Sequence, residues 1–368
     1  MRIEKAVLRH VEMPLKFVFR TSFAETTVKR FLLLELRSGG LSGWGECVAE
    51  EGPFYGPEST GTAEHVLAQF LLPLVLRREL EAPEEFARLA TKIRGNRMAK
   101  ATLDTALHDL FAKARGVSLS HTIGGTRASV EVGVSLGLAP TVEATLENVR
   151  RHVAQGYRRI KLKIEPGADV DRVSAVRAEF PGIVLTVDAN AAYGLADAAH
   201  LAKLDAFGLD YMEQPLSHED LVEHAELARR IETPICLDES IRSAADARAA
   251  ISLGACRVIN VKIGRVGGYG EVLAIQDVAR AAGVPLWCGG MLEAGVGRAH
   301  NVAVASLPGF TKPGDTSSSS RYFDDDIVAP PLEATGGLMP VPEGPGIGVS
   351  IRPDVLSRVT TSQMELAP

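Results

Sequence analysis

The stretch Arg159-Ile160-Lys161-Leu162-Lys163-Ile164 alternates charged and apolar side chains from one position to the next. Such alternation is typical of a β-strand, in which residues two apart share a face. Both lysines therefore point to one side of the strand, and Leu162 points to the other side with the isoleucines. We expect the apolar side to pack against helices, which leaves the lysines facing a functional cavity.

From about residue 130 the chain repeats short apolar strands, each followed by an amphipathic helix. An alternating series of about eight such βα units is the signature of a closed parallel barrel. We therefore predict an α/β fold of the (β/α)7β TIM-barrel type, with a doubly wound open sheet as the alternative. The predicted strands are Val130–Leu136, Arg159–Ile164, Ile183–Asn190, Leu209–Pro215, Pro234–Ser240, Arg257–Ile263, Val284–Met291 and an indistinct eighth near Phe310–Asp315.

The predicted barrel occupies residues 126–325, and the segments on either side of it do not continue the repeat of strand and helix. Residues 1–125 predict an α+β domain. Residues 326–368 are rich in Gly and Pro, and we expect a tail without regular structure that could return to the first domain. Within 1–125 the strands are expected at Ile3–Val11, Arg30–Arg37 and Leu41–Val48, and the helices near 60–77, 83–93 and 97–115.

The composition excludes several classes of protein. The chain is 46% hydrophobic and 23% charged, as in ordinary globular proteins, and its formal net charge is −6. Because it has no long Lys/Arg run, we expect neither nucleic acid nor a membrane as partner. The polar N-terminus favours a cytoplasmic location, and the four cysteines lack the close spacing of a zinc site. We expect a homo-oligomer acting on a small molecule.

Five charged residues fall at nearly equal intervals along the repeat. Lys163, Asp188, Glu213, Asp238 and Lys262 are separated by 25, 25, 25 and 24 positions. Each lies at the C-terminal end of a predicted strand, which is the end of a barrel where active sites lie. The spacing therefore predicts that these side chains converge on one point.

Three converging carboxylates would repel one another unless a cation neutralises them. An all-oxygen set without Cys or His favours a hard divalent cation. We therefore predict one Mg²⁺, or Mn²⁺, per active site, held by Asp188, Glu213 and Asp238.

The two lysines of this set come from the second and sixth strands, roughly opposite each other. A second cationic group nearby lowers the proton affinity of a lysine, so Lys163 beside Lys161 is a candidate base. A cation acidifies the α-proton of a bound carboxylate because it stabilises the enediolate that forms. The sequence thus predicts proton abstraction next to a carboxylate, with Lys163 and Lys262 on opposite faces of the substrate.

Over essentially its full length the chain resembles the muconate-lactonising subgroup of the enolase superfamily. The helical segment 101–110 is also similar to a signature that precedes the barrel in this superfamily. The resemblance implies a capping domain over residues 1–125 and a metal-dependent enzyme. Its motifs are Lys161-Leu162-Lys163, Asp188-Ala189-Asn190, Glu213-Gln214-Pro215, Asp238-Glu239-Ser240 and Asn260-Val261-Lys262.

More narrowly, three segments resemble the o-succinylbenzoate synthase / N-succinylamino acid racemase family, also called N-acylamino acid racemase. They are Arg94–Ala99, Gly289–Glu293 and Pro313–Thr316. This resemblance implies an isomerase that racemises N-succinyl or N-acylamino acids, a lyase that forms o-succinylbenzoate by syn dehydration in menaquinone biosynthesis, or both. The sequence leaves these two roles open.

The same resemblance implies where the substrate is bound. Ser135 and the backbone around Gly290 and Met291 are expected to contact it. Capping loops are expected at Thr21-Ser22-Phe23 and Phe54-Tyr55, with Phe23 and Tyr55 as candidate contacts.

Three further residues complete the candidate substrate contacts. Arg265 matches a position associated with the racemase branch. Asn190 shares the face of Asp188, and Asp315 ends the indistinct eighth strand.

Other activities stay open as alternatives. A dipeptide epimerase usually carries an Asp-x-Asp pair on the eighth strand, which Asp315-Thr316-Ser317 lacks. A muconate cycloisomerase activity is another possibility within the subgroup. A metal-free aldolase with Lys163 or Lys262 as a Schiff base, and a barrel that binds ligands without catalysis, are the alternatives from other classes.

Overall fold

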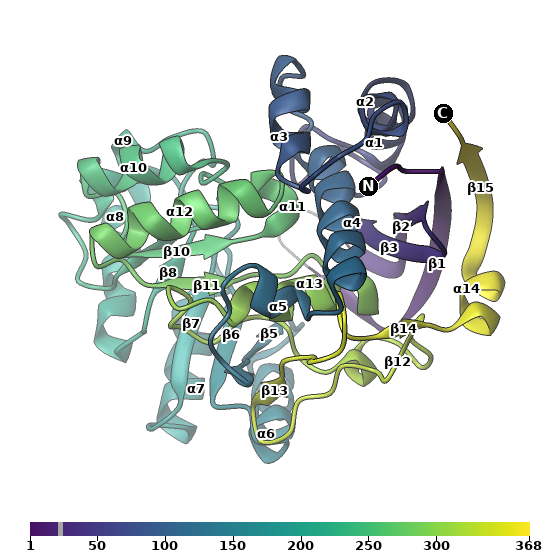
Figure 1. The fold of residues 1–368 in the computed structure, drawn as a ribbon. Coiled ribbons are helices and arrows are strands. Elements are labelled where there is room, and N and C mark those ends of the chain that lie inside the picture. Colours follow the sequence, from purple (N-terminus) through teal and green to yellow (C-terminus); the bar gives the residue numbers. More distant parts are fainter. Residues whose placement is uncertain (21–24) are drawn as a thin grey trace.

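The computed structural model describes residues 1–20 and 25–368 (Figure 1). A curled parallel sheet surrounded by helices lies beside a strand-rich unit, called the cap below, and helix α4 runs between the two. The cap and the curled sheet each have their own buried apolar cluster. The predicted α/β barrel with an N-terminal α+β unit is confirmed.

The cap is built on an antiparallel sheet of strand order β15-β1-β2-β3. Strands β1 and β2 form a long hairpin whose register shifts after Pro14 and resumes with Phe19 opposite Thr26. The far end of this hairpin reaches the mouth of the barrel, where Leu138 N donates to Arg20 O at 3.2 Å. The strands of the cap sheet that come first in the chain are β1 (Lys5–Arg20), β2 (Glu25–Ser38) and β3 (Leu41–Cys47).

The helices of the cap cover one side of this sheet. Strand β3 and helix α4 lie so close that a Cβ on Gly45 would sit 2.0 Å from Thr102 O, so only glycine fits at that position. The predicted helix over 97–115 coincides with α4. The helical segments are α1 (Thr60–Val66), the π-helix η1 (Leu67–Leu71), α2 (Leu72–Leu76), α3 (Glu85–Leu89), η2 (Ala90–Lys92), α4 (Arg97–Arg115) and α5 (Leu119–Thr122).

The barrel is a parallel sheet of order β11-β10-β9-β8-β7-β6-β5. Its strands are shorter than the sequence predicts, and β6, β7 and β8 still end at Lys163, Asp188 and Glu213. They are β5 (Val134–Leu136), β6 (Arg159–Lys163), β7 (Val184–Asp188), β8 (Met212–Glu213), β9 (Ile235–Leu237), β10 (Val258–Val261) and β11 (Leu286–Cys288), with a separate short β4 (Ser129–Glu131) before β5.

Helices fill the connections between the barrel strands and cover the outside of the sheet (Figure 1). They are α6 (Val142–Ala154), α7 (Val170–Glu179), η3 (Leu195–Asp197), α8 (Ala198–Leu201), η4 (Ala202–Phe207), α9 (Val222–Leu227), α10 (Ala244–Leu253), α11 (Ile263–Val266), α12 (Tyr269–Ala281) and α13 (Gly295–Ala305).

The predicted eighth strand near Phe310–Asp315 is not a regular strand. Single parallel bridges join Phe310 to Leu286 and Gly314 to Val132, so this segment still spans the gap between the last and first strands. Lys312 N donates to Leu286 O at 3.1 Å, and Gly314 N donates to Glu131 O at 3.0 Å. Isolated bridges replace a ladder here because Pro313 has no backbone N–H to donate.

The expectation that residues 326–368 lack regular structure is wrong. Strand β15 pairs with β1 in antiparallel register from Ala6↔Leu366 onward, at the edge of the cap sheet. Most side chains of β15 are exposed, so no apolar alternation marks it in the sequence. The elements of this segment are β12 (Val328–Ala329), β13 (Leu338–Pro340), β14 (Ser350–Ile351), α14 (Pro353–Val359) and β15 (Thr360–Leu366), preceded by η5 (Ser319–Arg321).

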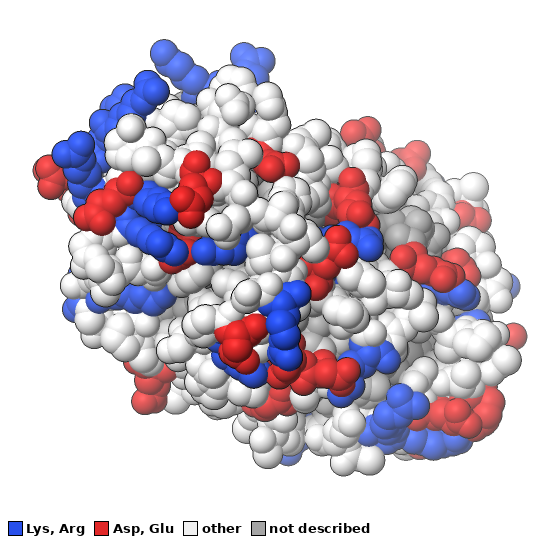
Figure 2. Space-filling model, turned by 90° about the vertical axis from the view of Figure 1, so that its right-hand side faces the viewer, with Lys and Arg blue, Asp and Glu red and all other residues white. Residues whose placement is uncertain are grey.

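The surface is mixed in charge. Figure 2 shows acidic and basic side chains interspersed on the face it presents, rather than gathered in a field of one sign. Several form ion pairs, such as Lys5 with Glu365 at 2.6 Å between β1 and β15. Among the helices of the described residues, none is both long and apolar enough to cross a membrane.

Candidate active site

The five evenly spaced charged residues, called the strand-end ring below, lie at one end of the barrel. Lys163, Asp188 and Glu213 are the last residues of β6, β7 and β8, and they are paired directly with one another in the parallel register. Asp238 directly follows β9, and Lys262 directly follows β10. Their side chains are at most 9% exposed, so each charge is largely removed from water.

Two lysines of β6 hold the first two carboxylates of the ring. Lys161 Nζ lies 2.7 Å from Glu213 Oε2 and 3.4 Å from Asp188 Oδ2. Lys163 Nζ lies 2.7 Å from Asp188 Oδ2 and donates to Asn190 Oδ1 at 2.5 Å. Because both lysines project from one face of β6, a single strand neutralises two neighbouring carboxylates.

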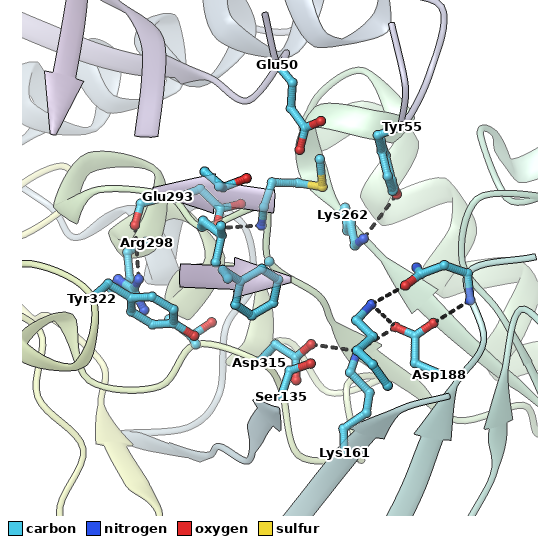
Figure 3. Close-up of a pocket in the computed structure, with 18 residues that line it drawn as sticks. Glu50, Tyr55, Ser135, Lys161, Asp188, Lys262, Glu293, Arg298, Asp315 and Tyr322 are labelled. Atoms are coloured by element: carbon cyan, nitrogen blue, oxygen red, sulfur yellow. Dashed lines mark hydrogen bonds and ion pairs between the residues drawn. The ribbon is translucent and has the colours of Figure 1, made fainter. Parts of the chain in front are cut away.

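On the other side of the site, Lys262 Nζ lies 2.7 Å from Asp238 Oδ2 and donates to Tyr55 Oη at 3.1 Å. The Tyr55 ring, which comes from the cap, lies 4.5 Å from the same nitrogen (Figure 3). Arg265 forms an ion pair with the remaining oxygen of Asp238. Burial lowers the pKa of Lys262, but Tyr55 and Glu239 outweigh burial and raise it above its ordinary value.

The ion pairs in the ring move the pKa values of its members apart. Burial raises the pKa of Asp188, but the ammonium groups of Lys163 and Lys161 outweigh it and lower that pKa to about 2. Burial, together with the neighbouring Asp188, raises the pKa of Glu213. Burial lowers the pKa of Lys161, yet the carboxylates around it, Asp315 first, raise it well above its usual range.

A second buried layer lies below the ring. Arg159, 1% exposed, pairs with Asp315 at 2.7 Å and stacks over the Trp287 ring at 5.4 Å. Lys161 Nζ lies 2.8 Å from the second oxygen of Asp315 and 4.6 Å from the same ring. Trp287 Nε1 in turn donates to Cys236 Sγ at 3.3 Å. Asp315 is thus held between two cations, and this layer fixes Lys161 from beneath.

One cavity opens onto the ring between the barrel and the cap (Figure 3). Ten of the residues predicted for the site line it: Tyr55, Ser135, Lys161, Lys163, Asp188, Asn190, Lys262, Gly290, Met291 and Asp315. Glu213, Asp238 and Arg265 do not line the cavity and lie buried behind it. Phe23, with Thr21 and Ser22, lies outside the described residues.

The loop after β11, which supplies Gly290 and Met291, is held by buried charged residues of the cap. Lys29 Nζ donates to Met291 O at 2.8 Å. Glu46 accepts from Ala294 N and Gly297 N, both at 2.8 Å, at the N-terminus of α13. Burial raises the pKa of Glu46 to about 8. The cap therefore shapes the cavity from behind as well as from above.

Sequence reasoning missed eight lining residues as parts of the site: Phe19, Thr26, Glu50, Leu292, Glu293, Arg298, Thr316 and Tyr322. Apolar residues two apart in β1, such as Phe17 and Phe19, give a weak signal for a shared face. Glu50 and Tyr322 lie outside regular strands and carry no such pattern. Their place depends on how the cap sits on the barrel.

The carboxylates of the ring are turned onto lysine and arginine side chains, and across residues 1–20 and 25–368 no group of three or more His, Cys, Asp and Glu residues could hold a metal ion as arranged. The chemistry of the ring nonetheless fits a hard cation, because all of its acceptors are oxygens. Beside the ring there are also oxygen acceptors that no donor among the described residues satisfies. Glu239 Oε2 and Asn260 Oδ1 are buried beside the ring without a hydrogen-bond partner among the described residues.

Comparison with known protein families identifies both parts of the chain. Residues 144–355 match the enolase C-terminal domain-like family, and residues 3–124 match the N-terminal domain of mandelate racemase / muconate lactonizing enzyme. The chain belongs to the enolase superfamily. Enzymes of the enolase superfamily generally use a divalent metal, typically Mg²⁺.

Individual members of the enolase superfamily match over nearly the whole chain. An N-succinylamino acid racemase from Thermus thermophilus is 56% identical over 99% of this chain and 98% of its own length. An o-succinylbenzoate synthase from Geobacillus stearothermophilus is 52% identical over 97% of this chain and 96% of its own. A crystal structure of an enolase superfamily member from Listeria innocua has a TM-score of 0.97 at 44% identity, covering 100% of this chain and 99% of that one.

Proposed function

We propose that this enzyme removes the proton α to a carboxylate through an enediolate and acts as an N-succinyl/N-acylamino acid racemase, an o-succinylbenzoate synthase, or both. The observation that carries the proposal is the pair of lysines, Lys163 and Lys262, on separate strands with three carboxylates between them. Relatives that are 56% and 52% identical carry the two names.

Asp188, Glu213 and Asp238 are the proposed ligands of one Mg²⁺ or Mn²⁺. When bound, the ion would neutralise the three carboxylates and polarise the carboxylate of the substrate, which acidifies the α-proton. Lys161 and Arg265 already neutralise ring carboxylates and would share in holding the negative charge that develops.

Lys163 and Lys262 are the proposed acid–base pair. In racemisation one lysine takes the α-proton from one face, and the other returns a proton to the opposite face. In the syn dehydration a single face suffices, so Lys163 would act first as base and then as acid to the departing hydroxyl. Lys262 would then stabilise the intermediate by its charge.

The other lining residues are assigned to binding. We assign contacts with the substrate to Ser135, Asn190, Tyr55, Asp315 and the backbone at Gly290 and Met291, with Arg265 behind Tyr55. Phe23, outside the described residues, stays a candidate contact. Closure of the cap over the substrate would exclude water and strengthen these contacts. A homo-oligomeric assembly and a cytoplasmic location stay predictions.

The test compares the two reactions and the two lysines in one set of assays. The enzyme, loaded with Mg²⁺, is incubated in D₂O with each enantiomer of an N-succinyl amino acid and, separately, with the dehydration substrate. We expect racemisation with deuterium in both enantiomers. Lys163→Ala should still exchange the α-proton of one enantiomer, and Lys262→Ala only that of the other.

The matched control is Lys203→Ala, an exposed lysine on η4, which should behave like the wild type. Metal binding, measured by calorimetry, should survive in both lysine variants. If either Lys163→Ala or Lys262→Ala still interconverts enantiomers near the wild-type rate, the two-base mechanism is wrong. A borohydride-trapped adduct with a carbonyl substrate would instead support the Schiff-base alternative.

A further inference from the structure

Glu50 is a carboxylate on the cap side of the cavity. It follows β3, is half-buried, and enters the cavity from above, across from Lys161 and Asp188 (Figure 3). Lys262, one of the two lysines that would bracket the α-carbon, lies between these levels in the same view, and Lys163 also lines the cavity. A substrate held by its α-carboxylate at the ring therefore projects its other groups toward the outer walls, one of which carries Glu50.

The acidic residues around Glu50 differ from it in their partners. Glu51 pairs with Arg30 at 2.8 Å, and Glu25 pairs with Arg20. Glu293 also lines the cavity, but its Oε2 accepts from the backbone N–H of Met291 at 2.8 Å, within its own loop. For Glu50 no side-chain hydrogen bond or ion pair to another described residue is present. Among the described residues, Glu50 is thus a cavity-lining carboxylate that is not held by another side chain.

A different wall of the cavity is positively charged. It is formed by Tyr322, whose ring lies 4.8 Å from the guanidinium of Arg298 and 4.8 Å from that of Arg321. Neither arginine forms an ion pair with a carboxylate among the described residues. Arg321 donates to Ser135 O at 2.8 Å, and Arg298 donates to Glu293 O at 3.0 Å. The buried guanidinium of Arg298 and the half-buried one of Arg321 therefore both lie against the ring of Tyr322. These three residues are called the Tyr322 wall below.

We infer that Glu50 selects the side chain of the substrate, favouring N-succinyl amino acids with basic side chains and disfavouring those with acidic ones. The inference rests on the proposed function. The terminal carboxylate of a succinyl group is attracted to the Tyr322 wall and repelled by Glu50, which orients the acyl group toward Tyr322 and the amino-acid side chain toward Glu50. Glu50 acts on specificity and has no part in proton transfer.

The test measures charge preference as a ratio. Exchange of the α-proton in D₂O is followed by NMR for N-succinyl-lysine and N-succinyl-glutamate, with N-succinyl-methionine as the neutral reference. We expect kcat/KM for the lysine derivative to exceed that for the glutamate derivative. In Glu50→Gln the ratio should fall roughly thirtyfold, because unit charges about 4 Å apart in a water-like dielectric change each kcat/KM about fivefold and the two substrates respond in opposite directions. In Glu50→Lys it should invert.

Two controls separate a charge effect from a structural one. Glu51→Gln removes the neighbouring carboxylate, which already has a partner, and should keep the wild-type ratio. Raising the salt concentration should shrink the wild-type ratio, because screening weakens interactions between partly exposed charges. If Glu50→Gln leaves the ratio unchanged, or shifts it no more than Glu51→Gln does, the inference is wrong.

Binding is measured separately by calorimetry on the Mg²⁺-loaded enzyme, so that turnover is not required. If no N-succinyl amino acid exchanges its α-proton, the proposed function fails, but the ratio of the two dissociation constants in wild type and Glu50→Gln still tests the role of Glu50. If neither compound binds, the inference fails as well.

Discussion

The barrel and the cap contribute to the same cavity in different ways. Barrel residues such as Lys161, Lys163 and Asp188 are buried, come from strand ends, and are held in ion pairs shorter than 3.5 Å. Cap residues such as Glu50 and Tyr55 are half-buried and come from the loop after β3. The difference fits the proposal that the chemistry is done by the buried ring and that the cap wall sets the selectivity.

The largest expected effect lies in the ring. Asp238→Asn removes one proposed ligand and the partner of Lys262, so turnover should fall by at least roughly 10³-fold. Chelation of the metal should have a similar effect. Assays with added Mg²⁺ and calorimetric titration of the ion measure this, with the exposed Asp324→Asn as control. Full turnover by the metal-free enzyme would contradict a metal-dependent ring.

The layer beneath the ring should control stability rather than selectivity. Arg159→Met leaves Asp315 with only one of its two cations in a buried setting, and we expect the free energy of unfolding to fall by about 3 kcal/mol. Urea titration measures it. The control is Arg352→Gln, which breaks an exposed pair with Asp325 and should leave the unfolding midpoint unchanged. If both variants lowered the free energy of unfolding equally, the buried pair would contribute no more to stability than the exposed one.

In the cap, Glu35 is also a buried carboxylate held by two cations, Arg9 and Arg37, and it is 4% exposed. Burial raises the pKa of Glu35, but hydrogen bonds from Arg37, Ser42 and Arg9 outweigh burial and leave it lowered. A folded-state pKa below the unfolded one stabilises the protein above the unfolded pKa of about 4.3, and this stabilisation is lost as the pH falls through the folded value.

Glu35→Gln should therefore reduce the free energy of unfolding by about 1–2 kcal/mol at neutral pH. The gap between wild type and variant should narrow in acid, below about pH 4. Urea titrations at several pH values test this. A gap that is constant with pH would show that the lost contacts, and not the charge, cause the change.

The smallest expected effect is at the point where the two regions touch. Tyr55→Phe removes the hydroxyl group that accepts from Lys262 but keeps the aromatic ring over the ammonium group. We expect kcat/KM to fall roughly fivefold, the usual range for one hydrogen bond. Tyr193→Phe, which removes a hydroxyl bound to Asp169 away from the cavity, is the control. A loss above about 10³-fold would place Tyr55 within the acid–base machinery.

The two regions also differ in how far the sequence predicts them. The ring could be read from the sequence because strand periodicity gives the face of each residue, and equal spacing gives its strand. The partners of Lys161 show the limit, because Asp315 is separated from it by more than 150 residues and belongs to a segment without a regular strand. No local pattern reports which distant segment closes a barrel.

The same limit explains what was missed in the cap. Lys29 and Glu46 belong to none of the motifs found in the sequence, yet both reach across to the loop after β11. Glu50 enters the cavity from an irregular segment of the cap, and Tyr322 enters it from an irregular segment of the barrel. Their roles depend on the docking of one domain on the other, and periodicity within a single element carries no information about docking.

The pairing of β1 with β15 bears on how this enzyme could be re-engineered. Leu8 lies opposite Met364, so the cap sheet is completed by β15, which follows the barrel in the sequence. Exchanging the cap with that of a relative by one crossover near residue 125 would leave a foreign β1 beside the native β15. If residues 1–125 were produced alone, the backbone edge of β1 that pairs with β15 would be exposed. Such an edge promotes pairing with a strand of another molecule. A chimera that carries both segments from the same donor keeps this edge matched.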